Sequence, residues 1–198
     1  MAKVQMSATE YIGKGWEMFT ANPGMFIVIV IIAMGINMAA SFTYVGGLII
    51  GGPLSVGLAY CALRQLDEGT FEIGDMFQGF KQFLPAMLAG LLVTLFSFVG
   101  ALLCIIPGII VGVLYALTYF YLADRKMDFW PAMEASREVV WENFGGFLLL
   151  GLLLALLNIA GAMLCGVGLL VTIPMTLGAM ASAYRAVTGA APAAEPAS

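Results

Sequence analysis

Histidine is absent from this chain of 198 residues, and charged residues are scarce. Without histidine, the chain lacks the commonest general base and the usual protein ligand of zinc and of haem iron. Charged residues make up 10% of the chain, whereas a soluble domain carries about 25%. The eight Lys and Arg are outnumbered by twelve Asp and Glu, for a net charge of −4. This balance excludes a nucleic-acid binder, which needs a basic surface.

Apolar residues fill the chain instead and account for 62% of it, against about 45–50% in an ordinary soluble domain. A soluble core of this size cannot bury that excess, so the composition excludes a soluble enzyme and a disordered protein. The charges fall in four stretches. Between these stretches lie three uncharged blocks, over residues 20–63, 82–123 and 143–184.

Each uncharged block is long enough for two membrane spans. A membrane helix needs about 20 apolar residues to cross roughly 30 Å of hydrocarbon, and each block has about 40 residues. The predicted spans are 24–44, 47–64, 84–104, 107–124, 145–164 and 167–185. Glycine and proline mark the short turns within the blocks at 45–47, 106–108 and 165–168. The sequence therefore predicts an all-α polytopic membrane protein with six spans, in a single membrane domain over residues 1–188.

An even number of spans places both termini on one side of the membrane, together with every Lys and Arg. The positive-inside rule makes that side the cytoplasm. No cleavable signal peptide is expected, because the first 23 residues are mixed and polar, and the first span would act as a signal anchor. The last residues, 189–198, read GAAPAAEPAS and predict a disordered tail.

The three blocks resemble one another in sequence. A shift of 121 residues aligns the first with the third, and a shift of 61 aligns the first with the second. Three sets of residues agree in all units: Gly47, Gly108 and Gly168; Ala62, Ala123 and Ala183; Arg64, Arg125 and Arg185. The pattern predicts three parallel hairpin repeats, over about 7–64, 71–125 and 128–185. Chance matching between chains rich in Gly and Ala is the alternative.

Each predicted unit begins with an amphipathic segment, at residues 7–20, 72–83 and 128–144. Their apolar faces carry Trp and Phe, which suit the headgroup layer of a membrane. We therefore expect three interfacial helices on the cytoplasmic face. The alternative is that these segments are the cytosolic ends of tilted spans.

Few polar residues lie within the predicted spans. Asn37 and Asn158 are equivalent in the repeat, Ser97 lies near the matching place in the middle unit, and Tyr115 lies in the fourth span. We interpret the asparagines as interhelical hydrogen-bond donors, with a polar pathway as the alternative. Pro53 and Pro174 predict kinks in the second and sixth spans.

The arginines of the repeat, Arg64, Arg125 and Arg185, each close a hairpin at the cytoplasmic boundary. They either fix the orientation of the chain or contact lipid phosphates. Cys104 and Cys165 fall near the opposite surface, where a disulfide is an alternative to free buried thiols.

No catalytic, metal-binding or cofactor-binding residue is predicted. The sequence has no phosphate-binding glycine loop, no nucleophile elbow and no metal-ligand spacing. Glu134, Glu138 and Glu142 lie on one helical stripe, which is typical of a solvated face. The absence of charges within the spans also counts against a coupled secondary transporter.

Several motifs in residues 83–187 carry a resemblance to a known family. They are an Ile106-Pro107-Gly108 turn, an A-x-x-x-S helix from Ala132 to Ser136 that ends near Asn143-Phe144, and a last span with Gly166, Gly168, Pro174 and Tyr184-Arg185. This pattern resembles the bacterial inner-membrane proteins grouped with the membrane domain of glycerophosphoryl diester phosphodiesterase. The resemblance implies a multi-pass inner-membrane protein without an assigned activity. Its enzymatic label is not carried over, because the chain has neither room for the catalytic domain nor its His and Glu chemistry.

We therefore expect a non-enzymatic protein of the bacterial inner membrane that binds lipid or a partner and affects envelope physiology. Its partners would be membrane lipids, another membrane protein or a second copy of the chain, and not nucleic acid. The alternative function is a channel or transporter for a small neutral or lipidic substrate. A membrane-embedded enzyme is a third reading, for which the sequence lacks a nucleophile or a carboxylate cluster.

Overall fold

The structure is a computed structural model that describes residues 7–42, 46–103, 105–164 and 166–189. Every regular element in these ranges is helical, as predicted, and none is a strand. The α-helices are α1 (Ala8–Ala21), α2 (Pro23–Ser41), α3 (Gly46–Glu68), α4 (Phe83–Leu103), α5 (Ile105–Leu114), α6 (Thr118–Arg125), α7 (Phe129–Glu142), α8 (Phe144–Met163) and α9 (Leu169–Thr188). A 3₁₀ helix, η1 (Ile73–Gln82), precedes α4.

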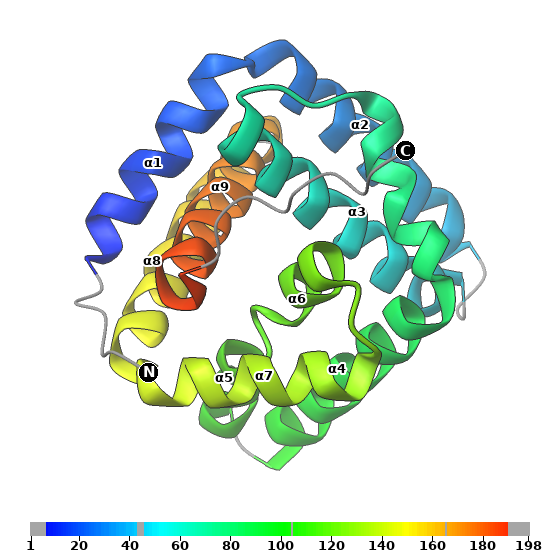
Figure 1. Ribbon diagram of the computed structural model, residues 1–198, viewed down its shortest axis with the longest axis vertical. Helices are drawn as coiled ribbons and strands as arrows, with labels where there is room; N and C mark the ends of the chain where they lie inside the picture. The colour runs from blue at the N-terminus through cyan, green and yellow to red at the C-terminus, as the bar shows by residue number, and fades with distance from the viewer. Residues whose placement is uncertain (1–6, 43–45, 104, 165, 190–198) are drawn as a thin grey trace.

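Three inner helices, α3, α6 and α9, are surrounded by the rest of the chain (Figure 1). One amphipathic helix packs against each of them: α1 against α9, η1 against α3 and α7 against α6. Figure 1 shows α1, η1 and α7 along three sides of the molecule. Because α1 contacts α9, the first described helix lies beside the last, and the helices form a closed ring.

Two of these contacts are too close to admit a side chain. A Cβ built on Gly15 of α1 would lie 2.3 Å from the carbonyl oxygen of Met175 in α9. A Cβ built on Gly57 of α3 would lie 1.8 Å from the carbonyl oxygen of Met76 in η1. Glycine therefore permits these approaches, as small residues do between helices in membranes.

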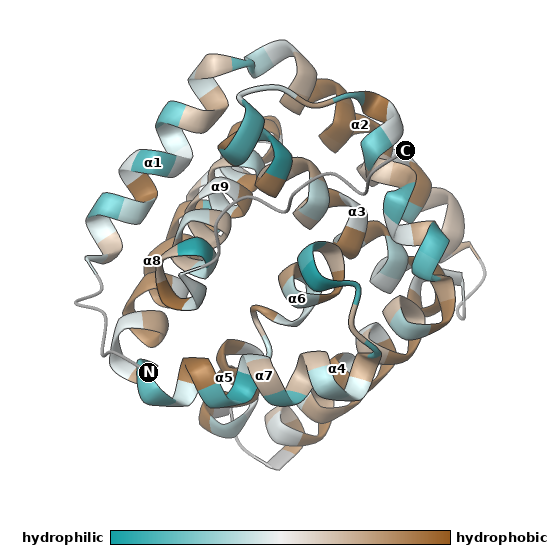
Figure 2. Cartoon of the chain, in the orientation of Figure 1, coloured by the Kyte–Doolittle hydropathy of each residue, from teal (hydrophilic) through white to brown (hydrophobic). Residues whose placement is uncertain are grey.

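The outer helices α2, α4 and α8 turn large apolar side chains outward, and Figure 2 shows these helices as largely hydrophobic. The exposed residues, three or four apart on each helix, are Ile31, Met34 and Met38 of α2; Leu91, Leu95 and Phe98 of α4; and Leu149, Leu152, Leu156 and Ile159 of α8. An apolar surface of this extent is unfavourable in water and suits a lipid environment.

Five segments of the described chain are long and apolar enough to cross a membrane. They are Pro23–Ala40, Gly46–Glu68, Ile73–Leu102, Ile106–Arg125 and Phe144–Met163. These segments overlap the first five predicted spans, as expected of a multi-pass membrane protein. The sixth predicted span overlaps α9, which is not among the five and carries several polar residues.

The fourth predicted span, 107–124, coincides with the apolar segment Ile106–Arg125, but an interruption divides it into two helices, which the sequence did not predict. Helix α5 ends at Leu114 and α6 begins at Thr118. By contrast, α3 and α9 continue as helices through Pro53 and Pro174, and the expected kinks there stay a prediction. The interruption therefore occurs where the sequence has no proline.

The second amphipathic segment is a 3₁₀ helix rather than an α-helix. With three residues per turn, side chains three apart lie on one face. Met76 and Gly79, three residues apart, are accordingly buried towards α3, and Phe77 is exposed on another face. Ile73, the first residue of η1, is exposed although it precedes Met76 by three residues. Cys104 and Cys165, with the disulfide that was the alternative to free thiols, lie outside the described residues. So does the predicted disordered tail, 189–198, except for Gly189.

Candidate functional site

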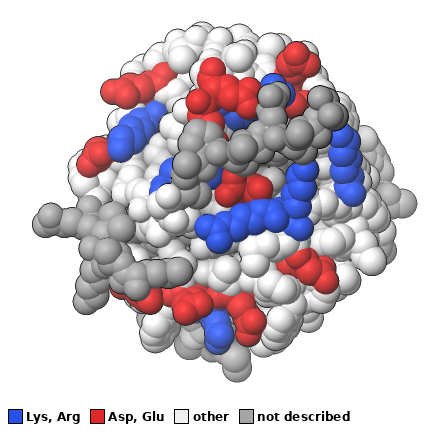
Figure 3. Space-filling view, in the orientation of Figure 1, with Lys and Arg blue, Asp and Glu red and all other residues white. Residues whose placement is uncertain are grey.

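Charged side chains gather at the end of the molecule where α3, α6 and α9 finish, and Figure 3 views this end. We call it the charged end. Its ion pairs involve Arg64, Asp67, Glu68, Asp75, Asp124 and Arg185. Arg64, Arg125 and Arg185, which the predicted repeat aligns, all lie here, but in three different environments.

Arg185 of α9 joins the three inner helices. Its Nη1 donates to Oδ1 of Asp124 in α6 at 2.9 Å, and its Nε and Nη2 donate to the two carboxylate oxygens of Asp67 in α3. The hydroxyl of Tyr184 donates to the other oxygen of Asp124 at 2.8 Å. The side chains of Arg185, Asp67 and Asp124 are 12%, 14% and 6% exposed. These largely shielded pairs hold the ends of the inner helices in one arrangement.

Arg64 joins α3 to η1. Its Nη1 donates to both carboxylate oxygens of Asp75, at 2.8 and 2.9 Å, and its Nε donates to Glu68 at 2.8 Å. Asp75 also accepts the backbone N–H of Glu72 at 2.8 Å, within the capping box of η1. The guanidinium of Arg64 is thus occupied by carboxylates of the protein.

Arg125 is exposed at the end of α6. Its guanidinium carbon lies 5.5 Å from the centre of the Tyr121 ring, a cation–π distance. Within the described ranges it makes no ion pair, unlike Arg64 and Arg185. Whether any of the three contacts lipid phosphate stays a prediction.

Asn158 connects α8 to α9. Its Nδ2 donates to the hydroxyl of Thr176 in α9 at 2.8 Å and to the carbonyl of Leu154 in its own helix at 2.9 Å. The Thr176 hydroxyl in turn donates to the carbonyl of Thr172 at 2.8 Å. This is the geometry of an interhelical hydrogen bond between membrane helices, which is worth about 0.6 kcal/mol on average.

The other polar candidates lie on different elements. Asn37 is exposed on α2, and its Nδ2 donates to the carbonyl of Ala33 in the same helix at 3.1 Å. Ser97 is half-buried on α4. Tyr115 lies in the interruption between α5 and α6, with its ring centre 6.1 Å from that of Phe96 in α4. The four polar candidates thus lie on different elements: Asn37 on α2, Ser97 on α4, Tyr115 between α5 and α6, and Asn158 on α8.

A side chain from α7 satisfies the backbone groups that are left free at the interruption between α5 and α6. The N–H of Thr118 donates to Tyr115, at 3.1 Å, instead of to Leu114 as in a regular α-helix. The Ser136 hydroxyl donates to the freed Leu114 carbonyl at 2.8 Å and accepts the N–H of Leu117 at 3.2 Å. Ser136 is fully buried, so it replaces two backbone hydrogen bonds where no water reaches.

Replacing Ser136 with Ala should lower the free energy of unfolding by about 1–3 kcal/mol, because it leaves buried backbone groups without partners. Thermal unfolding of the detergent-solubilised protein measures the change. The matched control is Ser182→Ala, since Ser182 is buried and its hydroxyl has no hydrogen-bond partner among the described residues. Equal stability of the two variants would contradict this role of Ser136.

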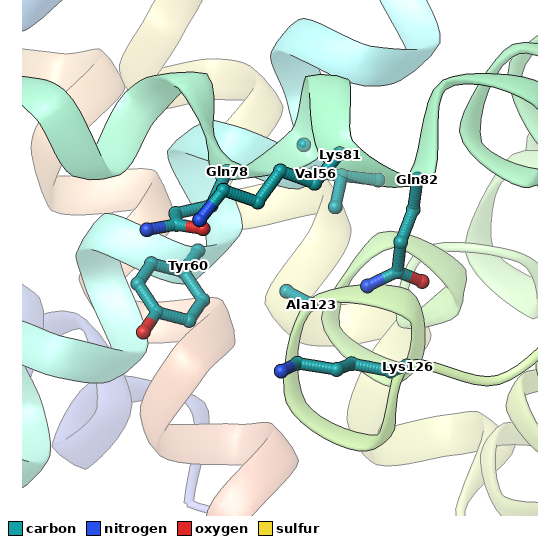
Figure 4. Close-up of a pocket in the computed structure, with 8 residues that line it drawn as sticks. Val56, Tyr60, Gln78, Lys81, Gln82, Ala123 and Lys126 are labelled. Carbon is teal, nitrogen blue, oxygen red and sulfur yellow. The ribbon is translucent and has the colours of Figure 1, made fainter. Parts of the chain in front are cut away.

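A cavity of about 260 Å³ opens at the charged end between α3, η1 and the end of α6. Its lining residues are Val56, Tyr60, Gln78, Gly79, Lys81, Gln82, Ala123 and Lys126. In Figure 4, Gln78, Lys81 and Gln82 extend from η1 on one side, and Lys126 lies on the opposite side. Gln82 donates from its Nε2 to the carbonyl of Leu122 at 3.3 Å and thereby connects η1 to α6.

Sequence reasoning missed the acidic partners of the arginines and every residue of this cavity. Asp67 and Asp124 entered the sequence analysis only through the net charge, although each stands within three residues of Arg64 or Arg125. Lys81 and Lys126 lie on separate elements, and no spacing connects them. Among the described residues, no group of three or more Cys, Asp or Glu side chains is placed to hold a metal ion.

Three mycobacterial proteins are similar to this chain at 34% identity over 103 residues: the uncharacterized protein Mb2590 of Mycobacterium bovis and the uncharacterized proteins MT2637 and Rv2560 of Mycobacterium tuberculosis. The similar segment covers 52% of this chain and 32% of each relative, so the chain matches about a third of the length of these curated relatives. No family model matches the chain, and no solved structure matches it. The chain is thus similar, over half its length, to part of longer mycobacterial proteins.

Proposed function

We propose that this chain is a non-enzymatic, multi-pass protein of the bacterial inner membrane that acts by binding lipid or a partner membrane protein. The observation that carries the proposal is the apolar outer surface of α2, α4 and α8, together with the amphipathic helices at one end. Trp16 on α1 and Trp130 and Trp141 on α7 are 49%, 52% and 65% exposed. Exposed aromatic side chains on amphipathic helices favour the headgroup layer of a membrane.

The proposal includes α9 as a sixth span. Its 20 residues are enough to cross a bilayer. Its polar residues Thr172 and Thr176 are directed inward, since Thr172 is buried and Thr176 bonds Asn158 of α8. Six spans bring both termini to the charged end, which the positive-inside rule assigns to the cytoplasm.

The proposal also includes three parallel hairpin units. The shift of 61 residues takes Gly15 to Met76, and the shift of 121 takes Gly57 to Gly178. Gly57 packs against Met76, and Gly178 packs against Gly15. Equivalent positions therefore make equivalent contacts between an amphipathic helix and an inner helix, which supports the repeat.

Single cysteines in a cysteine-free background test the topology. Cysteines at Thr70 and Glu134, which are exposed at the charged end, should react with a membrane-impermeant maleimide only after the cells are permeabilised. Cysteines at Ile106 and Val167, which are 70% and 67% exposed at the other end, should react in intact spheroplasts. Reaction of the Thr70 or Glu134 cysteine in intact spheroplasts would contradict the proposed orientation.

A channel or transporter for a small neutral or lipidic substrate is the second candidate function. It is favoured by two buried oxygens, Oδ1 of Asn158 and Oγ1 of Thr172, which have no hydrogen-bond partner in the described part of the chain. A hydrated pathway would supply that partner. Loss of substrate flux in proteoliposomes of an Asn158→Leu variant would favour this second function, and unchanged flux would favour the first.

The resemblance to the membrane domain of glycerophosphoryl diester phosphodiesterase is part of the same proposal. That family consists of multi-pass membrane proteins, in line with the apolar helices described here. The proposal takes no catalytic activity from it, because the chain contains no histidine.

A further inference from the structure

We propose that the cavity at the charged end binds a phosphoryl anion, with the ammonium groups of Lys81 and Lys126 as its main ligands. Arg64 and Arg185, at the same end, are occupied by carboxylates of the protein. Neither Lys81 nor Lys126 forms an ion pair with a carboxylate among the described residues. Two exposed lysines without an ion-pair partner thus line one cavity, in a chain whose net charge is −4.

The backbone of Lys126 is a second, independent observation. This residue ends α6 in the left-handed conformation, at φ 48° and ψ 36°. No other non-glycine residue in the described ranges has a positive φ. Glycine is the usual residue at such a helix end, because a Cβ is disfavoured there. Unfavourable backbone conformations of this kind cluster at ligand sites, and this one places a lysine side chain along the cavity wall (Figure 4).

The neutral residues of the cavity suit an oxyanion. The Tyr60 hydroxyl and the Gln78 amide can each donate a hydrogen bond from the lining. A phosphoryl group offers three strongly accepting oxygens, enough for two ammonium groups and a neutral donor at once. A carboxylate offers two oxygens in one plane, which matches ligands from several sides less well.

The shape of the cavity limits the size of the anion. Val56, Gly79 and Ala123 form the apolar part of its wall. A Cβ at Gly79 would lie 2.0 Å from the carbonyl oxygen of Pro53, so that part of the wall stays small. The volume of about 260 Å³ lies just below the range of about 300–1,000 Å³ that is typical of larger ligands. The cavity therefore fits a phosphate with a small substituent.

Two sources present this chemistry: a free phosphate or small phosphate ester, and the headgroup of a phospholipid. The lipid source rests on the membrane function proposed above, and the free anion does not. If the proposed membrane topology is wrong, binding of free phosphate to the cavity still tests this inference.

The test uses the purified full chain in an uncharged detergent, and its variants are Lys126→Gly, Lys81→Gln and the control Arg137→Gln. Equilibrium dialysis measures binding of radiolabelled inorganic phosphate, and native mass spectrometry measures retention of phosphatidic acid against diacylglycerol.

Each lysine variant should weaken binding by about tenfold, as expected for the loss of one charge-assisted hydrogen bond. Arg137 is exposed on α7 outside the cavity, so its variant should bind as the parent does. Lys126→Gly should keep or raise the melting temperature, because glycine tolerates the left-handed conformation.

The outcomes separate the two sources. Phosphate binding that the lysine variants weaken identifies a free anion, and selective retention of phosphatidic acid that they abolish identifies a headgroup. Absence of both kinds of binding would overturn the proposal. An equal loss of binding in Arg137→Gln would also overturn it, because that result indicates general charge attraction. Displacement of the bound phosphate by an equal concentration of acetate would overturn it as well.

Discussion

Replacing Arg185 with Met should destabilise the protein by about 3–5 kcal/mol, because it leaves shielded carboxylates without their counter-charge. Asp67 and Asp124 are 14% and 6% exposed, and Arg185 is their ion-pair partner from α9. Asp67 is on α3, Asp124 on α6 and Arg185 on α9. Loss of their ion pairs therefore lets the ends of the three inner helices separate. Unfolding in mixed detergent micelles, followed by circular dichroism, measures the change in free energy.

Two further variants show whether this loss comes from the unpaired carboxylates. Arg137→Met, at an exposed position on α7, should change the stability by less than about 0.5 kcal/mol. Adding Asp67→Asn and Asp124→Asn to Arg185→Met should restore part of the stability, because the remaining groups are then neutral. If Arg185→Met is as stable as the Arg137 control, the ion pairs do not hold the inner helices together.

Replacing Gly57 with Ala should destabilise the protein by about 3 kcal/mol, at the upper end of the usual cost of overpacking. The added Cβ would lie 1.8 Å from the carbonyl oxygen of Met76, so η1 must move away from α3. A backbone oxygen within a helix cannot shift as the tip of a flexible side chain can. Hydrogen exchange should consequently increase in η1, and the melting temperature should fall.

Gly51→Ala is the matched control for this change. Gly51 lies on the same helix, and a Cβ there would meet no atom within 4 Å. The substitution should therefore be neutral or stabilise α3 by up to about 1 kcal/mol, the difference in helix propensity. Similar effects of the two substitutions would mean that α3 and η1 do not approach as closely as described.

The positions of the helices could be predicted from the sequence because a membrane span depends on the length of an uncharged apolar run. That property is local, and blocks such as 20–63 display it directly. The interruption at Tyr115 could not be predicted in this way. It depends on Ser136, a residue of another helix that supplies hydrogen bonds to Leu114 and Leu117. Nothing in the sequence around Tyr115 indicates that this partner is present.

At the charged end, too, local sequence patterns could be predicted and contacts between distant residues could not. The predicted repeat aligns Arg64, Arg125 and Arg185, because that match depends on sequence alone. Their different environments depend on how the helices are rotated about their axes, which determines that Arg185 meets Asp67. The cavity was missed for a related reason, since the position of Lys126 follows from a left-handed backbone conformation rather than from helical spacing.

The contact between α1 and α9 has a consequence for the order of events during biosynthesis. Gly15 of α1 packs against Met175 and Gly178, so the docking surface for the first helix is made by the last one. This native contact joins segments at opposite ends of the chain, and such non-local contacts form late and slow folding. Until the ribosome has made α9, Tyr11 and Phe19, which α1 buries in the folded chain, lack their final environment. A nascent chain that does not yet include α9 therefore displays an undocked α1.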